Sequence, residues 1–338
     1  MAYTTINKST AHFNTKLYTG NGSTQSISGV GFQPDWTWIK KRNAAVGHRL
    51  TDAVRGATKT IFSDDAAVQA TLSTALTAFA SDGFSLGSET GVNNNSDTYA
   101  SWNWKAGGTG STNNDGSVAS TVSVNTTAGF SIVKWTGTGS AVTVGHGLGQ
   151  KPDILFVKRY TESSSWTVYT DVIDGTNDYL TLNATNAKGD SSNPVATTSV
   201  FQKSDTNGES IIAYCFASKT GYSKIGKYIG NARTDGTFVY TGFKPAFVIY
   251  KGAVGANAAD NWEMVDNKRS PGNGVENVLY PNLSNAEGTG VTTRMDLLSN
   301  GFKMRTSGND YNGSDQTYIY LAFGQSLVGS NNVPATAR

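Results

Sequence analysis

The pattern G83-F-S-L-G87 matches G-x-S-x-G, the motif that presents the nucleophilic serine of many hydrolases. That chemistry needs a strand before the serine and a helix after it. The residues that follow, S88-E-T-G-V-N-N-N-S-D97, are typical of a turn-rich loop instead. We therefore interpret Ser85 as a structural residue and expect no nucleophilic catalysis from it.

Acid–base cleavage of a glycan needs two carboxylates that face each other across the scissile bond. No E-x-D-x-E run occurs, and the glutamates fall mostly in loop-like stretches. The histidines His12, His48 and His146 lack the spacing of metal ligands. The loops 93–97 and 309–315 offer oxygen ligands for calcium, but loops rich in Asn and Asp more often form plain turns. We expect no enzyme activity, no metal and no cofactor.

The composition favours short strands joined by many turns. Of the 338 residues, 15% are charged, 11% are aromatic and 38 are glycine. The net charge of +2 gives no electrostatic footprint for nucleic acid or an anionic membrane. The single cysteine, Cys215, excludes an intramolecular disulfide and favours folding in a reducing compartment. No signal peptide is expected, and no apolar run approaches the roughly 18 residues of a membrane helix.

Several sequence elements recur three times in the same order, which indicates an internal repeat. One is a proline-led element that ends in lysine: G31-F-Q-P-D-W-T-W-I-K40, G149-Q-K-P-D-I-L-F-V-K158 and G242-F-K-P-A-F-V-I-Y-K251. Another closes each copy: Y99-A-S-W-N-W-K105, I211-I-A-Y-C-F-A217 and Y318-I-Y-L-A-F-G324. The fold class predicted is all-β, with three tandem related β-sandwich repeats at 1–107, 124–221 and 222–328. A flexible Gly/Ser/Asn-rich linker is expected at 108–123 and a tail at 329–338.

Alternate residues of the proline-led strand share one face. That face carries Trp36 and Trp38 in the first copy and aliphatic or phenylalanine side chains in the others. Because apolar bulk persists and the indole does not, we predict that these tryptophans fill a core rather than form a sugar platform. The lysine that ends each strand is predicted to be a rim charge that lies over the sheet end. Asp52, Asp171 and Asp266 are expected to correspond. The segment 64–79 is predicted to be a loop that runs into a strand.

The chain resembles a family of virion proteins from marine tailed phages, described as tail-fibre or lectin-like structural proteins. The resemblance rests on these segments: F32-Q-P-D-W-T-W-I-K40, S81-D-G-F-S-L-G87, F130-S-I-V-K-W-T-G-T-G139, D266-N-K-R-S270, Y318-I-Y-L-A-F-G-Q325 and V333-P-A-T-A-R338. It covers nearly the whole chain. It implies a concanavalin-like β-sandwich, a place on the phage particle and a part in host attachment. It brings no catalytic residues.

These observations predict a virion structural protein that is folded and assembled in the host cytoplasm. The favoured role is a tail or fibre component that attaches to host-surface glycan. The alternative is a capsid decoration or head-fibre protein, and a glycan depolymerase is the least favoured. Expected partners are other virion proteins and further copies of the chain, as a trimer. Asn267, Lys268 and Arg269 are the candidate ligand-binding residues, with a salt-bridged corner as the competing interpretation. Residues 1–13 and 329–338 are candidate docking segments.

Overall fold

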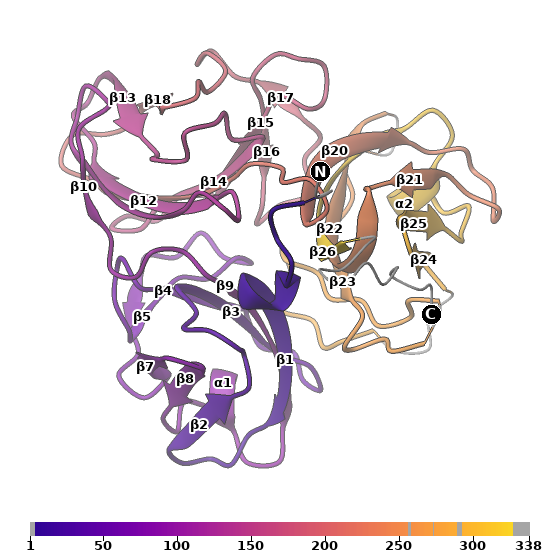
Figure 1. Ribbon diagram of the computed structural model, residues 1–338, viewed down its shortest axis with the longest axis horizontal. Coiled ribbons are helices and arrows are strands. Elements are labelled where there is room, and N and C mark those ends of the chain that lie inside the picture. The colour runs from indigo at the N-terminus through magenta and orange to yellow at the C-terminus, as the bar shows by residue number, and fades with distance from the viewer. Residues whose placement is uncertain (1–3, 256–257, 273, 289–292, 327–338) are drawn as a thin grey trace.

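A computed structural model describes residues 4–326 except 256–257, 273 and 289–292, so the predicted tail 329–338 lies outside the described residues. The all-β prediction is confirmed, because antiparallel sheets make up almost all regular structure. The sheets gather into three lobes around a common centre (Figure 1). No helix in the described part of the chain is long and apolar enough to cross a membrane.

The first lobe comprises the strands up to β9. Its larger sheet has the order β1 (Phe13–Thr19), β9 (Thr98–Trp104), β3 (Trp36–Lys41) and β4 (Arg49–Asp52). The facing sheet has the order β2 (Gln25–Ser28), β8 (Gly83–Leu86) and β7 (Leu76–Ala80). Short elements complete the lobe: η1 (Ser9–Ala11), β5 (Lys59–Thr60), β6 (Ala70–Thr71) and α1 (Thr90–Asn93). The segment 64–79 is a loop leading into short strands, as predicted.

The second lobe pairs a long sheet with a short one. The long sheet has the order β10 (Ser111–Asn113), β11 (Ser120–Asn125), β12 (Phe130–Thr136), β19 (Ser210–Phe216), β14 (Ile154–Arg159), β15 (Thr167–Thr170), β16 (Asp178–Thr181) and β17 (Gly189–Asp190). The short sheet is β13 (Ala141–Gly145) with β18 (Val200–Ser204). The predicted linker 108–123 is not a free connection, because it contains β10 and the start of β11, which pair with each other.

The third lobe repeats the plan of the first. Its larger sheet has the order β20 (Ser223–Ile229), β26 (Thr317–Ser326), β22 (Phe243–Val254) and β23 (Glu263–Asp266). The facing sheet has the order β21 (Phe238–Tyr240), β25 (Gly301–Met304) and β24 (Met295–Leu298), and α2 (Asn309–Asn312) follows β25.

Strand register is the same in the three lobes. Trp38 pairs with Trp102, Phe156 with Tyr214, and Ile249 with Leu321. The central strands are buried on both faces because each sheet has two apolar neighbours. One face of β3 contributes Ile39 to the interior of its own lobe, and the other contributes Trp36 and Trp38 to a core shared by all three lobes.

The tryptophans are core residues, as predicted, but their core lies between lobes rather than inside one sandwich. Trp36 stacks on Tyr214 of the second lobe at a ring distance of 4.2 Å, and Trp104 lies 5.9 Å from Phe247 of the third. Buried aromatic side chains contribute large apolar areas, and truncating one typically costs about 3–5 kcal/mol. The shared core therefore fixes the lobes to one another.

Polar bonds between lobes follow the same cyclic order. Ring nitrogens of three corresponding residues each reach a carbonyl of the preceding lobe: Trp166 reaches Phe62 O at 2.7 Å, Trp262 reaches Thr181 O at 2.9 Å, and His48 reaches Tyr280 O at 3.0 Å. Burial lowers the pKa of His48 to about 3, so its ring is neutral. Its Nδ1 accepts a bond from Trp38 Nε1 at 2.7 Å. The chain is therefore arranged like a trimer around an approximate threefold axis.

The lysines that end the proline-led strands are not rim charges, so that prediction was wrong. Lys40, Lys158 and Lys251 are completely buried. Their ammonium groups donate to backbone carbonyls; Lys251 Nζ lies 2.6 Å from both Gly252 O and Ala258 O. Burial lowers the pKa of each lysine to about 8. A rim position would leave these loop carbonyls without a donor, which explains why a charged residue is retained inside.

Candidate functional site

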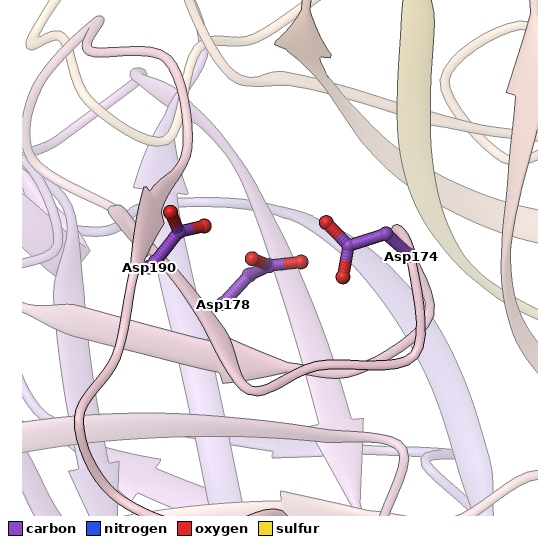
Figure 2. A group of neighbouring side chains, drawn as sticks. All are labelled: Asp174, Asp178 and Asp190. Carbon is purple, nitrogen blue, oxygen red and sulfur yellow. The ribbon is translucent and has the colours of Figure 1, made fainter.

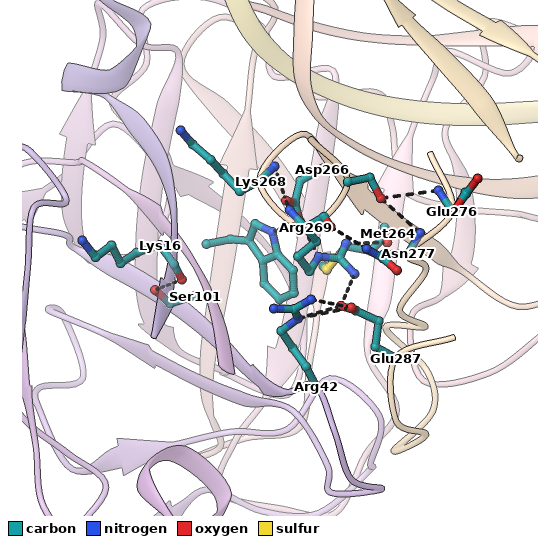
Figure 3. A network of polar contacts seen from close by, with 12 residues as sticks. Lys16, Arg42, Ser101, Met264, Asp266, Lys268, Arg269, Glu276, Asn277 and Glu287 are labelled. Atoms are coloured by element: carbon teal, nitrogen blue, oxygen red, sulfur yellow. Dashed lines mark hydrogen bonds and ion pairs between the residues drawn. The ribbon is translucent and has the colours of Figure 1, made fainter. Parts of the chain in front are cut away.

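The predicted residues Asn267, Lys268 and Arg269 form the turn after β23, at the junction of the third and first lobes. The side chain of Arg269 has no exposed area. It donates to Asp266 Oδ2 at 2.5 Å and to Met264 O at 2.9 Å, and it pairs with Glu287 at 3.1 Å (Figure 3). Glu287 also pairs with Arg42 of the first lobe at 2.7 Å. Arg269 therefore occupies a salt-bridged corner, while Lys268 is exposed and Asn267 is half-buried.

The first lobe contains the same corner, which the sequence reading overlooked. Arg55 Nε lies 2.6 Å from Asp52 Oδ2, and the D-x-x-R spacing of D52-A-V-R55 was the signal available. Each aspartate also accepts a bond from another lobe, Asp52 from Tyr214 at 2.7 Å and Asp266 from Trp102 at 3.1 Å. In the second lobe the residue in register is Thr170, one position before the predicted Asp171, because Thr170 pairs with Ile154 as Asp52 pairs with Trp36.

Three aspartates, Asp174, Asp178 and Asp190, place carboxylate oxygens within 4.8 Å of one another (Figure 2). The Nζ atom of Lys188 lies 2.7 Å from each of the three carboxylates. The ammonium group therefore takes the place that a metal ion would need. The backbone of Lys188 also donates to Ala253 O of the third lobe at 2.9 Å. The ion pairs of this cluster lie within the second lobe, and the backbone bond of Lys188 links it to the third lobe.

A groove of about 860 Å³ opens in the second lobe between the long sheet and the short sheet. Its floor and walls come from β14, β15, β18 and the loop 204–207. The polar and charged side chains of the lining include those of Arg159, Ser165, Thr167, Lys203, Asp205 and Asn207. None of the described residues that line it is aromatic, so recognition there depends on hydrogen bonds and charge.

The groove exists because the second lobe lacks a segment that the other lobes possess. In the first lobe residues 88–92 lie between Gly87 and Asn93, and Val92 packs into the lobe interior. In the third lobe residues 306–311 lie between Arg305 and Asn312, and Tyr311 packs into the lobe interior. In the second lobe Ser204 is followed at once by Asp205. Asn93, Asp205 and Asn312 are corresponding positions of the three lobes, because the carbonyl of each accepts the same backbone hydrogen bond in its lobe.

Substitutions at the edge of the missing segment make the groove polar. Lys203 stands where the other lobes hold the buried Leu86 and Met304. Asp205 stands where Asn93 donates its amide to Gly87 O at 2.7 Å. The carboxylate of Asp205 pairs with Lys203 at 3.0 Å through Oδ1. Its buried Oδ2 has no hydrogen-bond partner within the described residues, although the side chain is only 2% exposed.

Two carboxyl groups, those of Glu162 and Glu209, share a hydrogen bond beside the groove. Arg159 Nη1 contacts Glu209 at 3.0 Å. A hydrogen bond with Glu209, followed by the charge of Glu209, raises the pKa of Glu162. Burial alone would raise the pKa of Glu209, but hydrogen bonds from Glu162 and Arg159 outweigh it and lower that pKa. Burial likewise raises the pKa of Asp205. The groove and its edge therefore carry both cationic hydrogen-bond donors and carboxyl groups close together.

The sequence reading did not find this groove. The available signal was a gap in the repeat, since K203-S-D-T-N-G-E209 is much shorter than the corresponding stretches of the other copies. Ser85, which was considered for catalysis, lies in β8 and pairs with Ser26 of β2. His48, which was considered as a metal ligand, lies in the contact between the first and third lobes. Neither is near the groove lining.

The fold is an all-β arrangement of antiparallel sheets, and the groove is an open polar site in its second lobe. The chain matches the family model described as a domain of unknown function, DUF7483, over residues 8–326, and therefore belongs to that family. The match spans all three lobes of this chain. A comparison with curated proteins found no match.

Proposed function

We propose that the protein is a surface component of a phage virion, in the tail or a fibre, and that it attaches to host-surface glycan through the groove of the second lobe. The observation that carries the glycan-binding part is the open groove, where a segment that plugs the other lobes is missing. Its lining mixes hydroxyl, amide, carboxylate and basic groups, which suits a ligand made of many hydroxyls. The virion setting is supported by the resemblance of the sequence to structural proteins of marine tailed phages.

The Oδ2 atom of Asp205, which accepts no hydrogen bond within the described residues, is the feature that supports ligand binding most directly. A buried acceptor without a donor is costly, and a sugar hydroxyl would relieve that cost. Lys203 and Arg159 would donate to neighbouring sugar oxygens. Affinity at one shallow groove is modest, so attachment would gain from several molecules held on one particle.

The test is binding of the purified chain to a glycan array and to host-cell polysaccharide. Asp205→Asn and Lys203→Gln are expected to weaken binding about tenfold or more, since each loses a charge-assisted hydrogen bond. Lys59→Gln, on β5 in the first lobe, is the matched control and should bind like the wild type. Equal binding by all four proteins would contradict the groove assignment.

A capsid decoration protein is the second candidate function. The lobes repeat around an approximate threefold axis, and such a chain matches a site of threefold symmetry on a shell. Immunogold labelling of intact particles separates the two locations. Label on the tail or fibres supports the attachment role, and label spread over the head supports decoration.

A further inference from the structure

A second cavity opens on the long sheet of the second lobe, on the face opposite the groove. Its volume is about 360 Å³. The polar side chains of the lining that share this face are those of Thr112, Thr121, Lys134, Thr136, Tyr160 and Ser210. The groove is lined by Val157 and Arg159, which alternate along the chain with Lys158 and Tyr160 and therefore face the other way. The two sites share no lining residue.

Strand pairing gathers these side chains around Lys134. Thr112 pairs with Thr121, and Thr121 pairs with Lys134, so the three side chains form one row across β10, β11 and β12. Thr136 pairs with Ser210 in the next row on the same face. The Cβ atoms of directly opposed residues in antiparallel strands lie about 4.5–5.5 Å apart. The ammonium group of Lys134 is therefore flanked by hydroxyl groups.

The polar groups of this cavity are not used by the rest of the described chain. Lys134 is half-buried, and its ammonium group has no ion pair or hydrogen bond with any described residue. The hydroxyl groups of the five other side chains make no hydrogen bond within the described residues either. None of the described residues of the lining is acidic. The cavity therefore offers one cation without an anion, together with hydroxyls that can bond to a ligand.

The other lobes use the corresponding position to hold the lobes together. Leu17, Lys134 and Lys227 correspond, because each pairs with the residue that stands beside the buried lysine of its own lobe. Leu17 packs against the shared core, and Lys227 Nζ donates to Ile173 O of the second lobe at 2.6 Å. Lys134 makes neither contact. Among the described sheets, β10 and β11 also extend only that of the second lobe, since β1 and β20 are edge strands.

We infer that this cavity binds an acidic sugar residue, whose carboxylate or sulfate group pairs with Lys134 and whose hydroxyls bond to the surrounding threonine, serine and tyrosine hydroxyls. An ammonium group forms a charge-assisted bond to such an anion. A hydroxyl both donates and accepts, which matches the hydroxyls of a sugar ring. The volume lies within the range of about 300–1,000 Å³ typical of small-molecule sites. The inference rests on residues outside the groove and does not depend on glycan binding there.

The experiment is an NMR titration of the isotopically labelled full chain at low ionic strength, followed at the backbone amides of Thr121 and Lys134. The ligands are sodium glucuronate and glucose 6-sulfate, with glucose as the uncharged control and sodium sulfate as the control without a sugar ring. Both acidic sugars should shift these amides and bind about tenfold or more tightly than either control, because each control lacks one half of the recognition.

Four variants test the residues. Lys134→Gln should weaken binding of both acidic sugars about tenfold or more, because it removes the cation. Thr121→Asp places a carboxylate opposite Lys134 and should abolish binding, whereas the neutral Thr121→Asn should stay within about threefold of the wild type. Lys16→Gln is the matched control, since Lys16 is a partly exposed lysine on β1, the strand of the first lobe that corresponds to β12. It should bind like the wild type.

Tighter binding of glucuronate identifies a carboxylate ligand and tighter binding of glucose 6-sulfate a sulfated one; both support the site. The inference is overturned if neither acidic sugar shifts the two amides, or if glucose or sodium sulfate binds there as tightly. Wild-type affinity in Lys134→Gln and Thr121→Asp, both folded by circular dichroism, would overturn it as well. Asp205→Asn should leave this titration unchanged, so a failure at the groove and a failure at this cavity are separate results.

Discussion

Arg269 and Lys268 are neighbours in sequence with opposite surroundings. Removing Arg269 leaves Asp266 buried without its cation and leaves Glu287 with Arg42 as its remaining cation. We therefore expect Arg269→Met to lower the free energy of unfolding by about 3–5 kcal/mol. Lys268→Met should change it by no more than about 0.5 kcal/mol, because that side chain is exposed. Urea unfolding of the two variants measures both values. Equal effects would contradict the corner geometry.

The buried lysines make stability depend on pH in the alkaline range. Burial lowers the pKa of Lys40, Lys158 and Lys251 from 10.5 to about 8 in the folded state. Below pH 8 the folded and unfolded chains are both protonated there, and the cost of a buried charge is present in full. Between pH 8 and 10.5 the unfolded chain binds more protons, so stability rises with pH.

Each lysine should contribute on the order of 1–3 kcal/mol over that window. Denaturant unfolding at pH 7.5, 8.5 and 9.5 is the measurement. Lys251→Met removes one of the three groups, so the pH slope of the variant should be about one third smaller than that of the wild type. A flat or falling profile for the wild type would show that the lysines are hydrated.

At the residue scale, the sequence predicted which side chains share one face of a strand better than it predicted how deeply each face is buried. The apolar column of Trp36 and Trp38 was correctly assigned to a core, since alternation reports which side chains share a face. It could not report that the opposite face is buried as well. For that reason Lys40 was expected at a rim. Burial on both faces comes from neighbours far apart in the chain.

At the scale of elements, the segment 88–92 acts as a plug that the second lobe lacks. Inserting Ser88–Val92 between Ser204 and Asp205, together with Lys203→Leu and Asp205→Asn, should fill the groove and leave thermal stability equal or higher. Ligand binding at the groove should disappear. An insert of the same length made of Gly and Ser is the control, which should not bring the stabilising contact of Val92. A grafted protein that still binds glycan would show that the ligand lies elsewhere.

The all-β character of the chain was accessible from the sequence, and the structure of the linker was not. Residues 108–123 have the composition of a flexible connection, yet β10 and β11 pair there. Composition measures local preference, whereas an edge strand is held by its neighbour's backbone. The groove was not predicted from the sequence for a similar reason. An absent segment leaves no motif, and its effect is visible only beside the lobes that have it.

At the scale of the whole molecule, the shared core makes the lobes interdependent. We expect a single unfolding transition in calorimetry, with equal calorimetric and van 't Hoff enthalpies. Residues 124–221 alone would expose Phe156, Tyr214 and Phe216, which are buried against other lobes in the full chain. That fragment should bind a hydrophobic dye and aggregate. Three separate transitions, or a soluble monomeric fragment with native strand content, would contradict this expectation.

The covalent joining of the lobes has a further consequence for stoichiometry. A true homotrimer must carry every substitution three times, so a site gained in one subunit appears in all of them. Here the missing segment is confined to the second lobe. Each molecule therefore carries one copy of this groove. If the groove binds glycan as proposed, the valence of attachment must come from the number of molecules displayed together.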